Sequence, residues 1–571
     1  MTSLAAPELD VHATETTERL ARWSRHQLAA GIASGLLLWT SFPPVEWNWL
    51  VWLALTPLFW MAALPRATFK TYVSAWLGGL TFWVLAARWL RLTDPTAWPG
   101  WLALAVLFSL WWPGFLLLTR LAVHRLRVPL MLAAPIIWVG LEYVRAYFLS
   151  GFPWYYLAHS QFRSLYVIQI ADFAGSLGVS LLVAITNAWL VDLVTLPLLR
   201  TVKGSSPRLN RRQYVRLCLM IAIWGSTLCY GAFRISTAAF HDGPKVALLQ
   251  SNIEQSHKMK GDPNAIAREF QRLVLTALDR ADRPDLIVWP ETSYPFGFIS
   301  VDRRVDKAAL ERQVRSIAPA LLLADWIDKQ QAIANNLHSW TDQAGVAMLV
   351  GSLFYDHQPG GLERYNSCIL FEPNLRSTQF YHKMHLVPFG EYVPFVETLP
   401  WLVALTPYRG EKIPSLSFGR DASMLTLGRY RLAVSVCFED TIPQVIGQFF
   451  DPARGVQPDV LINASNDGWF RGSEELDMHR AIGVFRAVEH RVPLVRAVNT
   501  GLSALIDGNG EIRAALPKDK SDVLSVTVPL DGRVTLYSRW GDWLGLSCLA
   551  TLIGFIPLAL FKQIRARLTP S

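Results

Sequence analysis

The chain has few charged residues for its length. Asp, Glu, Lys and Arg make up only 17% of its 571 residues, whereas hydrophobic residues make up 51% and tryptophan occurs 24 times. A soluble enzyme of this length usually carries more charge, so the composition argues against a wholly soluble protein. The deficit is local. Residues 28–233 are apolar and rich in tryptophan, whereas residues 244–530 have the composition of an ordinary soluble domain.

Cysteine is also scarce, with five residues and no CxxC pair or Cys/His cluster. We therefore predict no structural metal site. Only Cys368 and Cys437 lie in the soluble part, and a disulfide between them is an alternative if this domain faces an oxidising compartment. The soluble part has no basic patch interleaved with aromatic residues, so the net charge of +9 does not indicate nucleic-acid binding.

Apolar runs near the length of a bilayer helix recur along the chain and predict a polytopic α-helical membrane bundle of about eight spans. The expected spans are 28–42, 47–64, 72–91, 98–119, 129–148, 174–198, 214–233 and 541–561. The first two are short and separated by two prolines. No cleavable signal peptide is expected, because the first residues are polar and mixed in charge.

Basic residues follow alternate spans, which orients the bundle because Lys and Arg concentrate in cytoplasmic loops. They are Arg66, Lys70, Arg120, Arg125, Arg127, Arg200, Lys203, Arg208, Arg211, Arg212, Arg216, Lys562, Arg565 and Arg567. We predict a cytoplasmic N-terminal segment (1–27), a transmembrane bundle (28–233), an outward-facing domain (244–530), a last transmembrane helix (541–561) and a cytoplasmic tail (562–571). In a bacterium with two membranes, this bundle lies in the inner membrane and the domain in the periplasm.

A transporter is an alternative function for such a bundle. Transporters carry ionisable residues near the middle of their spans, where substrates and ions bind. Here Arg88, Arg91, Glu142 and Arg145 cluster toward the outer ends, and Asp192 lies toward the inner end. No inverted repeat is visible in the sequence, so transport is disfavoured.

The soluble part alternates short apolar runs with segments of helical periodicity, which predicts an α/β domain. The expected strands are 245–253, 285–291, 346–354, 366–372, 432–438, 459–465 and 494–499, and the expected helices are 264–281 and 475–490. The run DGNG at 507–510 predicts a turn between two late strands. The segment 296–331 has the character of an insertion.

Three reactive side chains follow predicted strands. Glu291 ends the run WPE, Lys383 follows an apolar run, and Cys437 ends the run SVC. A thiol is only a few per cent ionised at neutral pH, so it needs a base, and a carboxylate in an apolar setting is a suitable one. The Lys383 ammonium is suited to stabilise an oxyanion. The set therefore predicts acyl transfer through a thioester, with Cys437 as the nucleophile and Glu291 as the general base.

The order Glu291, Lys383, Cys437 resembles the carbon–nitrogen hydrolase (nitrilase-like) superfamily, which implies an αββα sandwich. The motifs WPET (289–292), KMHLVPFGE (383–391), CFE (437–439) and NASNDGWF (463–470) resemble more specifically the apolipoprotein N-acyltransferase family. Two departures fall beside the expected acyl pocket. Met259 follows QSHK where the family often has Trp, and Phe438 follows the nucleophile where it often has Tyr.

Further residues are candidates for supporting roles. Glu391 is expected to position Lys383, and Glu439 to lie on the same strand face as Cys437. Met259, Phe438 and Trp469 are expected to line the substrate pocket, and Trp154 belongs to an aromatic run on the outer side that could guide lipid. A histidine paired with Cys437 is the usual alternative base. His382, His385 and His479 are the candidates, but no spacing places any of them near the thiol.

The resemblance implies transfer of the sn-1 acyl chain of a phospholipid, with phosphatidylethanolamine as the expected donor, to the α-amine of the N-terminal diacylglyceryl-cysteine of an apolipoprotein. No cofactor is expected. A membrane-anchored amidase or other hydrolase of the same superfamily is the first alternative, although one span would suffice to anchor it. A non-catalytic scaffold is the second, although it would not need all three reacting groups.

Overall fold

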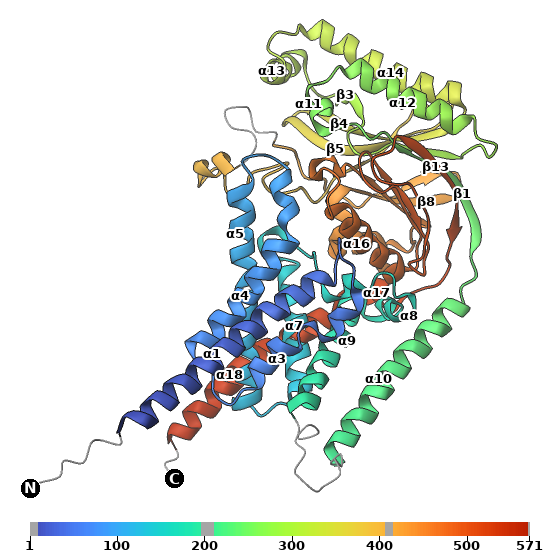
Figure 1. Ribbon diagram of the computed structural model, residues 1–571. Coiled ribbons are helices and arrows are strands. Elements are labelled where there is room, and N and C mark those ends of the chain that lie inside the picture. Colours follow the sequence, from blue (N-terminus) through green and yellow to red (C-terminus); the bar gives the residue numbers. More distant parts are fainter. Residues whose placement is uncertain (1–8, 196–210, 406–414, 569–571) are drawn as a thin grey trace, which may run out of the picture.

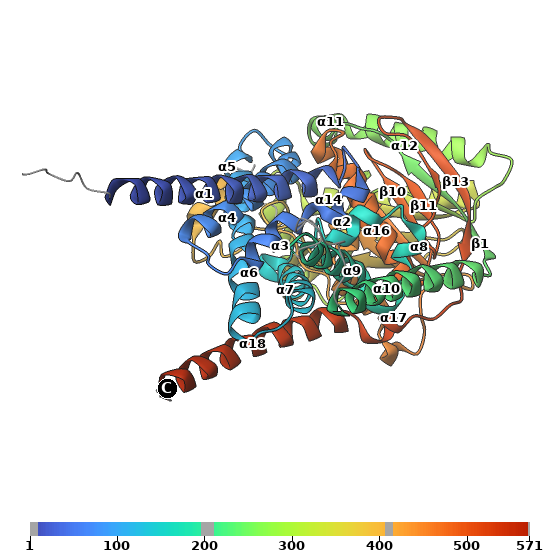
Figure 2. The same ribbon diagram turned by 60° about the horizontal axis from the view of Figure 1, so that its bottom comes forward.

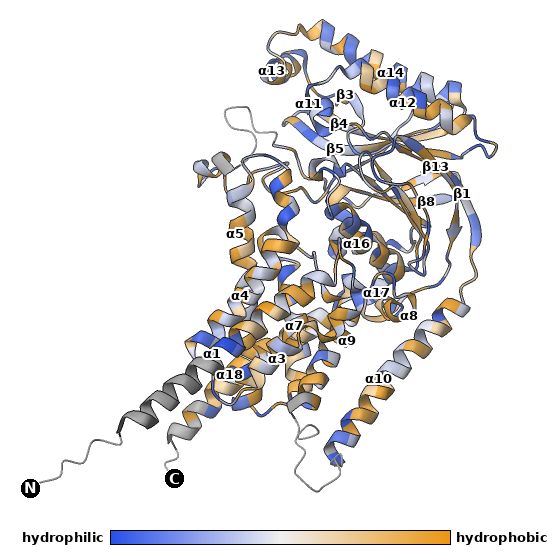
Figure 3. Ribbon diagram, in the orientation of Figure 1, coloured by the Kyte–Doolittle hydropathy of each residue, from blue (hydrophilic) through white to orange (hydrophobic). Residues whose placement is uncertain are grey.

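The protein divides into a bundle of apolar helices and a domain of two β-sheets. The computed structural model describes residues 9–195, 211–405 and 415–568. The bundle consists of the helices before residue 240 together with the last helix. The sheet domain lies between them in the sequence and at one end of the bundle in space (Figure 1). Apolar residues dominate the bundle, whereas polar residues are frequent in the sheet domain (Figure 3).

The bundle contains ten helices of varied length among the described residues. They are α1 (Leu9–Thr40), α2 (Val51–Ala54), α3 (Thr56–Ala63), α4 (Phe69–Ala86), α5 (Trp98–Ser109), α6 (Trp111–Arg120), α7 (Leu130–Arg145), α9 (Ala171–Thr195), α10 (Arg211–Ser236) and α18 (Trp543–Leu568). A short helix, α8 (Leu165–Ile168), lies at the end of the bundle nearest the sheet domain.

Among the described residues, four segments are long and apolar enough to cross a membrane: Trp98–Arg125, Ala171–Leu193, Gln213–Ser236 and Trp543–Lys562. The expected span 47–64 is divided into a short 3-10 helix, α2 and α3. Together they form an apolar helical segment, Asn48–Ala63, that is shorter than the four candidate spans. The first helix begins at Leu9, well before the expected start of the first span at residue 28. Of the basic residues expected between the sixth and seventh spans, Arg200, Lys203 and Arg208 lie outside the described residues.

Small residues allow α1 and α4 to pack backbone against backbone. A Cβ atom on Gly31 would lie 2.1 Å from the Ser74 carbonyl oxygen, and one on Gly78 would lie 2.3 Å from the Gly31 carbonyl oxygen. Because lipid offers helices no hydrophobic driving force to associate, such close van der Waals contact is a main source of their packing energy.

The sheet domain contains two mixed sheets. The first has the order β13-β1-β2-β4-β5-β6, with β3 also paired to β4, and the second has the order β12-β11-β10-β9-β8-β7. The strands of the first are β1 (His241–Gln250), β2 (Leu286–Val288), β3 (Tyr294–Val301), β4 (Ala347–Gln358), β5 (Gly361–Phe371), β6 (Gln379–His382) and β13 (Asp522–Leu530). Those of the second are β7 (Leu425–Leu427), β8 (Tyr430–Val436), β9 (Val460–Ser465), β10 (Leu494–Val498), β11 (Ala504–Ile506) and β12 (Ile512–Ala515).

Helices cover the outer face of each sheet (Figure 1). On one side, α12 (Pro263–Leu278) and α14 (Leu323–Ala344) pack on the first sheet through a core that includes Phe270 and Trp289. On the other side, α16 (Glu475–His490) lies between the second sheet and the bundle. Residues such as Leu248 and Val434 share one core, which continues into the bundle. The result is the four-layer arrangement of helices and sheets that defines the nitrilase-like fold.

Each of the seven expected strands overlaps an observed strand, and both expected helices are present as α12 and α16. The DGNG turn joins β11 and β12, which pair in antiparallel fashion. The expected insertion is structured and folds into β3, α13 (Lys307–Ile317) and the first turns of α14. Because β3 pairs with β4, this segment extends the first sheet and is part of the domain core.

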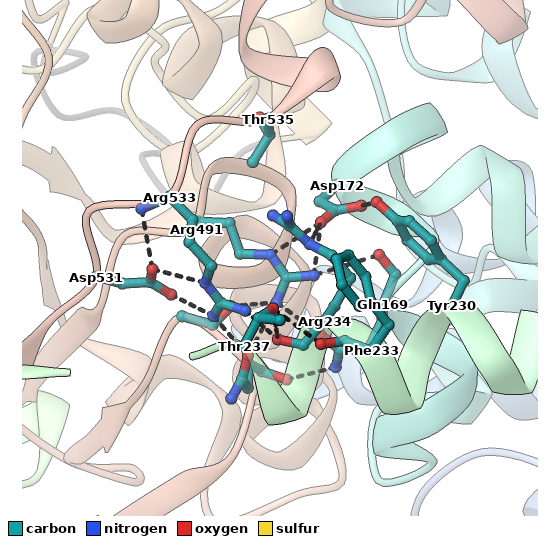
Figure 4. A network of polar contacts seen from close by, with 12 residues as sticks. Gln169, Asp172, Tyr230, Phe233, Arg234, Thr237, Arg491, Asp531, Arg533 and Thr535 are labelled. Atoms are coloured by element: carbon teal, nitrogen blue, oxygen red, sulfur yellow. Dashed lines mark hydrogen bonds and ion pairs between the residues drawn. The ribbon is translucent and has the colours of Figure 1, made fainter. Parts of the chain in front are cut away.

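A buried polar network joins the bundle to the sheet domain (Figure 4). Asp172 at the start of α9 accepts hydrogen bonds from Arg491 (2.7 and 3.0 Å) and from the Tyr230 hydroxyl (2.7 Å). It also forms an ion pair with Arg234 near the end of α10 (2.6 Å). Arg491, which follows α16, is fully buried and donates to Gln169 as well. One carboxylate thus connects α9, α10 and the sheet domain.

The last span before the sheet domain, α10, diverges from the other helices. It contacts mainly α8 and α9, and Figure 2 shows it lying to one side of the bundle beneath the sheets. Only four residues lie between its end at Ser236 and the first residue of β1, His241. The network around Asp172 therefore holds α10 at the end where the chain enters the sheet domain.

Replacing Arg491 with methionine should lower the thermal stability of the purified protein. The change removes two hydrogen bonds and one of the two ion-pair partners of the buried Asp172 carboxylate, and breaking a buried ion pair costs up to about 3–5 kcal/mol. The midpoint of thermal unfolding in detergent measures the effect, with Arg304→Met as the control because the Arg304–Asp302 pair lies at the surface. Equal midpoints for Arg491→Met and the wild type would show that the network does not stabilise the joint.

Candidate active site

Glu291 follows β2, and its carboxylate lies beside the polar side chains of Asn366 and Lys383. Only 7% of the residue is exposed. Asn366 of β5 donates one hydrogen bond to Glu291 Oε1 (2.7 Å) and another to Glu391 Oε1 (2.9 Å) from the same side-chain nitrogen. The amide thus holds two carboxylates side by side, with the Lys383 ammonium between them.

Lys383 follows β6 and is 1% exposed. Its Nζ lies 2.9 Å from Glu391 Oε2, 3.0 Å from Glu391 Oε1 and 3.4 Å from Glu291 Oε1. Burial alone would lower the pKa of Lys383, but the charges of Glu391 and Glu291 outweigh burial and raise that pKa. The lysine is therefore a permanent buried cation, as an oxyanion stabiliser needs to be.

Cys437 occupies a sharp turn at the end of β8. Its φ is 52°, in the left-handed region that non-glycine residues rarely adopt, and it begins the short 3-10 helix Cys437–Thr441. Asn463 of β9 donates to the Cys437 carbonyl oxygen (3.0 Å) and so fixes the turn. Cys437 is a free cysteine and is partly exposed.

The electrostatic setting keeps the Cys437 thiol protonated at rest. Burial raises its pKa well above the ordinary value, and the negative charge of Glu291 raises it further. The Lys383 ammonium and a hydrogen bond with Ser465 act in the opposite direction. Glu291 and Lys383 are thus both close enough to influence the ionisation of the thiol.

Glu439 joins the Cys437 turn to the Lys383 segment. It is fully buried, and its carboxylate accepts hydrogen bonds from the backbone N–H groups of Val436 (2.7 Å), Met384 (2.6 Å) and His385 (2.9 Å). The Tyr381 hydroxyl also donates to it (3.0 Å). Burial raises the pKa of Glu439 to about 7, although the backbone hydrogen bonds and Lys383 favour its charged form. Glu439 thus positions the two halves of the site.

The four expected pocket residues lie in different settings. Met259 is 57% exposed on the short helix α11 (Gln255–Lys260), and Trp469 is partly exposed in the loop after β9. Phe438 is partly exposed and packs against the apolar core of the bundle. Trp154 is buried, with its ring centroid 5.0 Å from that of Trp89 and 5.9 Å from that of His479. Trp154 therefore forms part of the wall between bundle and sheet domain.

Each candidate histidine has other partners. His382 lies 2.7 Å from the Ser367 hydroxyl and is stacked on Tyr365. His385 lies beside the ring of Phe438. The third, His479, lies between Asp440 and Asp467, at 2.7 and 3.2 Å. The alternative disulfide is also absent, because Cys368 and Cys437 are both free thiols.

Asp467, Glu475 and His479 place their potential ligand atoms within 4.8 Å of one another, so they are candidates to hold a metal ion. Burial and Arg496 favour neutral His479, but Asp440 and Asp467 outweigh them and raise its pKa to about 10. The imidazolium has no free lone pair for a metal. Arg496 also lies 2.7 Å from Asp440. Two cations therefore already compensate the carboxylates of this cluster.

Several residues of the site were not predicted. Asn366, Tyr381 and Asn463 are polar residues on buried strands, and each is hydrogen-bonded to a candidate catalytic or supporting residue. Lys258 donates hydrogen bonds to the turn at Glu291. A polar residue inside an apolar run is the signal that could have drawn attention to the three strand residues, because such a residue needs a buried partner.

Comparisons with known proteins agree with this geometry. The family model for carbon–nitrogen hydrolases matches residues 245–536, and the model for the apolipoprotein N-acyltransferase N-terminal domain matches residues 34–189. Among solved structures, a CN-hydrolase superfamily protein from Xanthomonas campestris aligns with 56% of this chain and 97% of its own, at 16% identity and a TM-score of 0.33. The match to the carbon–nitrogen hydrolase model, which covers more than half of the chain, shows that the sheet domain is a member of that superfamily.

Relatives that match nearly the whole chain narrow the assignment. An apolipoprotein N-acyltransferase from Geobacter metallireducens is 31% identical over 543 residues, covering 92% of this chain and 94% of its own. One from Chlorobaculum tepidum is 31% identical over 555 residues, covering 94% and 96%. The chain belongs to the apolipoprotein N-acyltransferase family.

The charges around Cys437 should move its pKa in opposite directions when they are removed. Glu291→Gln removes a negative charge and should lower the pKa of the thiol, whereas Lys383→Met removes a positive charge and should raise it. The rate of alkylation by iodoacetamide as a function of pH, measured on the peptide containing Cys437, reports the thiolate fraction. Shifts of the same sign in both variants would contradict the described geometry.

Proposed function

We propose that the protein is a phospholipid:apolipoprotein N-acyltransferase that works through an acyl-enzyme on Cys437. The observation that carries this proposal is the buried set of Glu291, Lys383 and Glu391 beside a thiol on a strained turn. A base, a fixed cation and a nucleophile at one place are the requirements of covalent acyl transfer. The family to which the chain belongs supports the lipid and lipoprotein substrates.

In the first half-reaction, Glu291 accepts the proton of the Cys437 thiol, and the sulfur attacks the sn-1 ester carbonyl of the phospholipid. The carbonyl oxygen becomes an oxyanion beside the Lys383 ammonium. When the intermediate collapses, the C–O bond to glycerol breaks, and the departing alkoxide takes the proton back from Glu291. Lysophospholipid leaves, and the acyl chain remains as a thioester on Cys437.

In the second half-reaction, the neutral α-amine of a diacylglyceryl-cysteine attacks the thioester. Glu291 accepts a proton from the attacking nitrogen, the C–S bond breaks, and the thiolate is reprotonated. The products are an N-acylated lipoprotein and the free enzyme, so the kinetics are ping-pong. Glu391 and Glu439 support the reaction by holding Lys383 and the Cys437 turn, and Met259, Phe438 and Trp469 are the proposed pocket wall.

The bundle serves this chemistry by holding the site at the surface of the lipid bilayer, where both substrates are anchored. Restriction to the membrane raises their effective concentration at the thiol. Phosphatidylethanolamine is the proposed acyl donor. We further propose the eight-span arrangement, with the sheet domain in the periplasm and both termini in the cytoplasm.

A single-turnover experiment separates transfer from hydrolysis. Wild type loaded with labelled phosphatidylethanolamine should form a thioester that a free diacylglyceryl-cysteine peptide discharges, whereas an N-acetylated peptide should leave it intact because an amide nitrogen is a poor nucleophile. Cys437→Ala should form no adduct and Glu291→Gln should accumulate almost none, since each lacks a component of thiolate attack. If water alone discharges the thioester as fast as the free peptide, the protein is a hydrolase.

The orientation is testable with single introduced cysteines. Asp328→Cys, on the exposed surface of α14, should react with a membrane-impermeant maleimide in intact spheroplasts. Arg66→Cys and Arg125→Cys, both exposed at the opposite end, should react only after the membrane is permeabilised. Labelling is read by the mass of the modified peptides. Protection of Asp328→Cys in intact cells would place the sheet domain in the cytoplasm and exclude periplasmic substrates.

A further inference from the structure

The short helix α11 is attached to both halves of the candidate active site. On one side, Asn466, in the loop after β9, donates to Gln255 Oε1 (2.7 Å). On the other side, Lys258 reaches the turn that follows β2. The chain before the helix is held by Asn499, which donates to the Ile253 carbonyl (2.9 Å) and accepts from the Ile253 N–H (3.1 Å). These hydrogen bonds fix the position of α11 relative to the candidate active site.

The Lys258 ammonium forms a hydrogen bond with the backbone of Glu291, the proposed general base. Its Nζ donates to the Glu291 carbonyl oxygen (2.7 Å) and to the Thr292 hydroxyl (3.0 Å). Among the described residues, no carboxylate forms an ion pair with it. Burial lowers the pKa of Lys258 to about 8, and the charges of Glu291 and Cys437 partly offset that effect. A surface lysine would be solvated, whereas this one is directed inward at a turn.

The turn that Lys258 contacts is strained. Thr292 has a φ of 44°, and a β-branched residue in the left-handed region is a genuine outlier that the surrounding structure has to hold in place. Ser293 donates its N–H to the Gly351 carbonyl (2.9 Å) and its hydroxyl to the Pro290 carbonyl (2.6 Å). Gly351 passes so close that a Cβ there would lie 2.0 Å from the Pro290 carbonyl oxygen. Lys258 adds two further hydrogen bonds to this turn.

We propose that Lys258 is a positioning residue for the acyl transfer. By donating hydrogen bonds to the Glu291–Thr292 turn, its ammonium fixes the Glu291 carboxylate relative to Cys437 and Lys383. This inference rests on the proposed function, because it assigns Glu291 the role of base. It adds a second lysine to the site with a separate task. Lys383 faces the carboxylate of Glu291, and Lys258 holds the backbone that carries it.

The test is the rate of acyl-enzyme formation from phosphatidylethanolamine by the full-length protein in detergent, followed by intact-protein mass in a single turnover. Lys258→Met should lower the maximal rate roughly 100-fold, because a displacement of about 1 Å at a reacting group costs that much. The half-saturating phospholipid concentration should not change, since the base is misplaced and the lipid site is intact. Lys260→Met, on the same helix but exposed, is the matched control and should acylate as the wild type does.

A double-mutant cycle with Thr292→Val tests whether Lys258 acts through the turn. Valine keeps the shape of threonine and removes only the hydroxyl, so this variant should acylate roughly 10-fold more slowly, an intermediate loss of alignment. The double variant should be no slower than Lys258→Met alone, because both changes release the same contact. If the two losses multiply, Lys258 acts elsewhere and the proposal is wrong.

The remaining outcomes are also decisive. If Lys258→Met acylates at the wild-type rate, Lys258 has no positioning role, although the proposed function stands. If Lys258→Met does not fold, Thr292→Val carries the test, and a wild-type rate in that variant overturns the proposal. If the wild type itself forms no adduct on Cys437, the proposed function fails and this inference fails with it.

Discussion

The burial of the Lys383 ammonium is the constraint on which the rest of the site depends. A cation with 1% exposure cannot remain charged without compensation, and two carboxylates supply it at 2.9 and 3.4 Å. Because Asn366 holds both carboxylates, Lys383 does not neutralise Glu291 alone. Among these three side chains, two negative charges therefore share one positive charge, and the charge of Glu291 still acts on Cys437.

That negative charge has a chemical consequence for the thiol. Burial and Glu291 raise the pKa of Cys437, so the resting enzyme holds a thiol rather than an exposed thiolate. Intrinsic nucleophilicity rises with thiol pKa, so under the proposed mechanism the thiolate formed when Glu291 takes the proton would be a strong nucleophile. In that mechanism the site limits oxidation of the thiol at rest and supplies a reactive sulfur when the ester is in place.

The sequence indicates where the three candidate reacting groups lie because each follows a buried strand of the kind that hydrophobic patterning detects. Glu291, Lys383 and Cys437 follow β2, β6 and β8, and the first and third of these strands were expected as such. Glu391 was expected beside Lys383, but the contribution of Asn366 was not predicted. Asn366 and Glu391 lie 75 and 100 residues from Glu291 in the sequence, and their convergence depends on how β5 and the loop after β6 are placed across the sheet.

The boundaries of the bundle were predicted less well for a different physical reason. Hydropathy measures length and composition, but helices in a bundle also end where backbone packing requires it. The region 47–64 is divided into short helices, and it is tied to α9 by Asn187, which accepts from the Leu55 N–H (2.9 Å) and donates to the Val51 carbonyl (2.9 Å). An asparagine in an apolar run can form hydrogen bonds with the backbone groups that an interrupted helix leaves unpaired. A hydropathy average does not detect such hydrogen bonds.

The position of the site near the contact between the bundle and the sheet domain bears on how a thioester would survive until an amine arrives. Phe438, the residue after Cys437, packs against the bundle core, and Phe470 packs edge-to-face on Trp89 with ring centroids 4.9 Å apart. The loops that carry the reacting groups are thus supported by the bundle as well as by the sheets. Under the proposed mechanism, a lipid-anchored amine is held near the site by the membrane, which raises its effective concentration at the thioester. Under the proposed mechanism, selectivity for aminolysis over hydrolysis then follows from where the domain rests, because the Glu, Lys and Cys chemistry alone would serve either nucleophile.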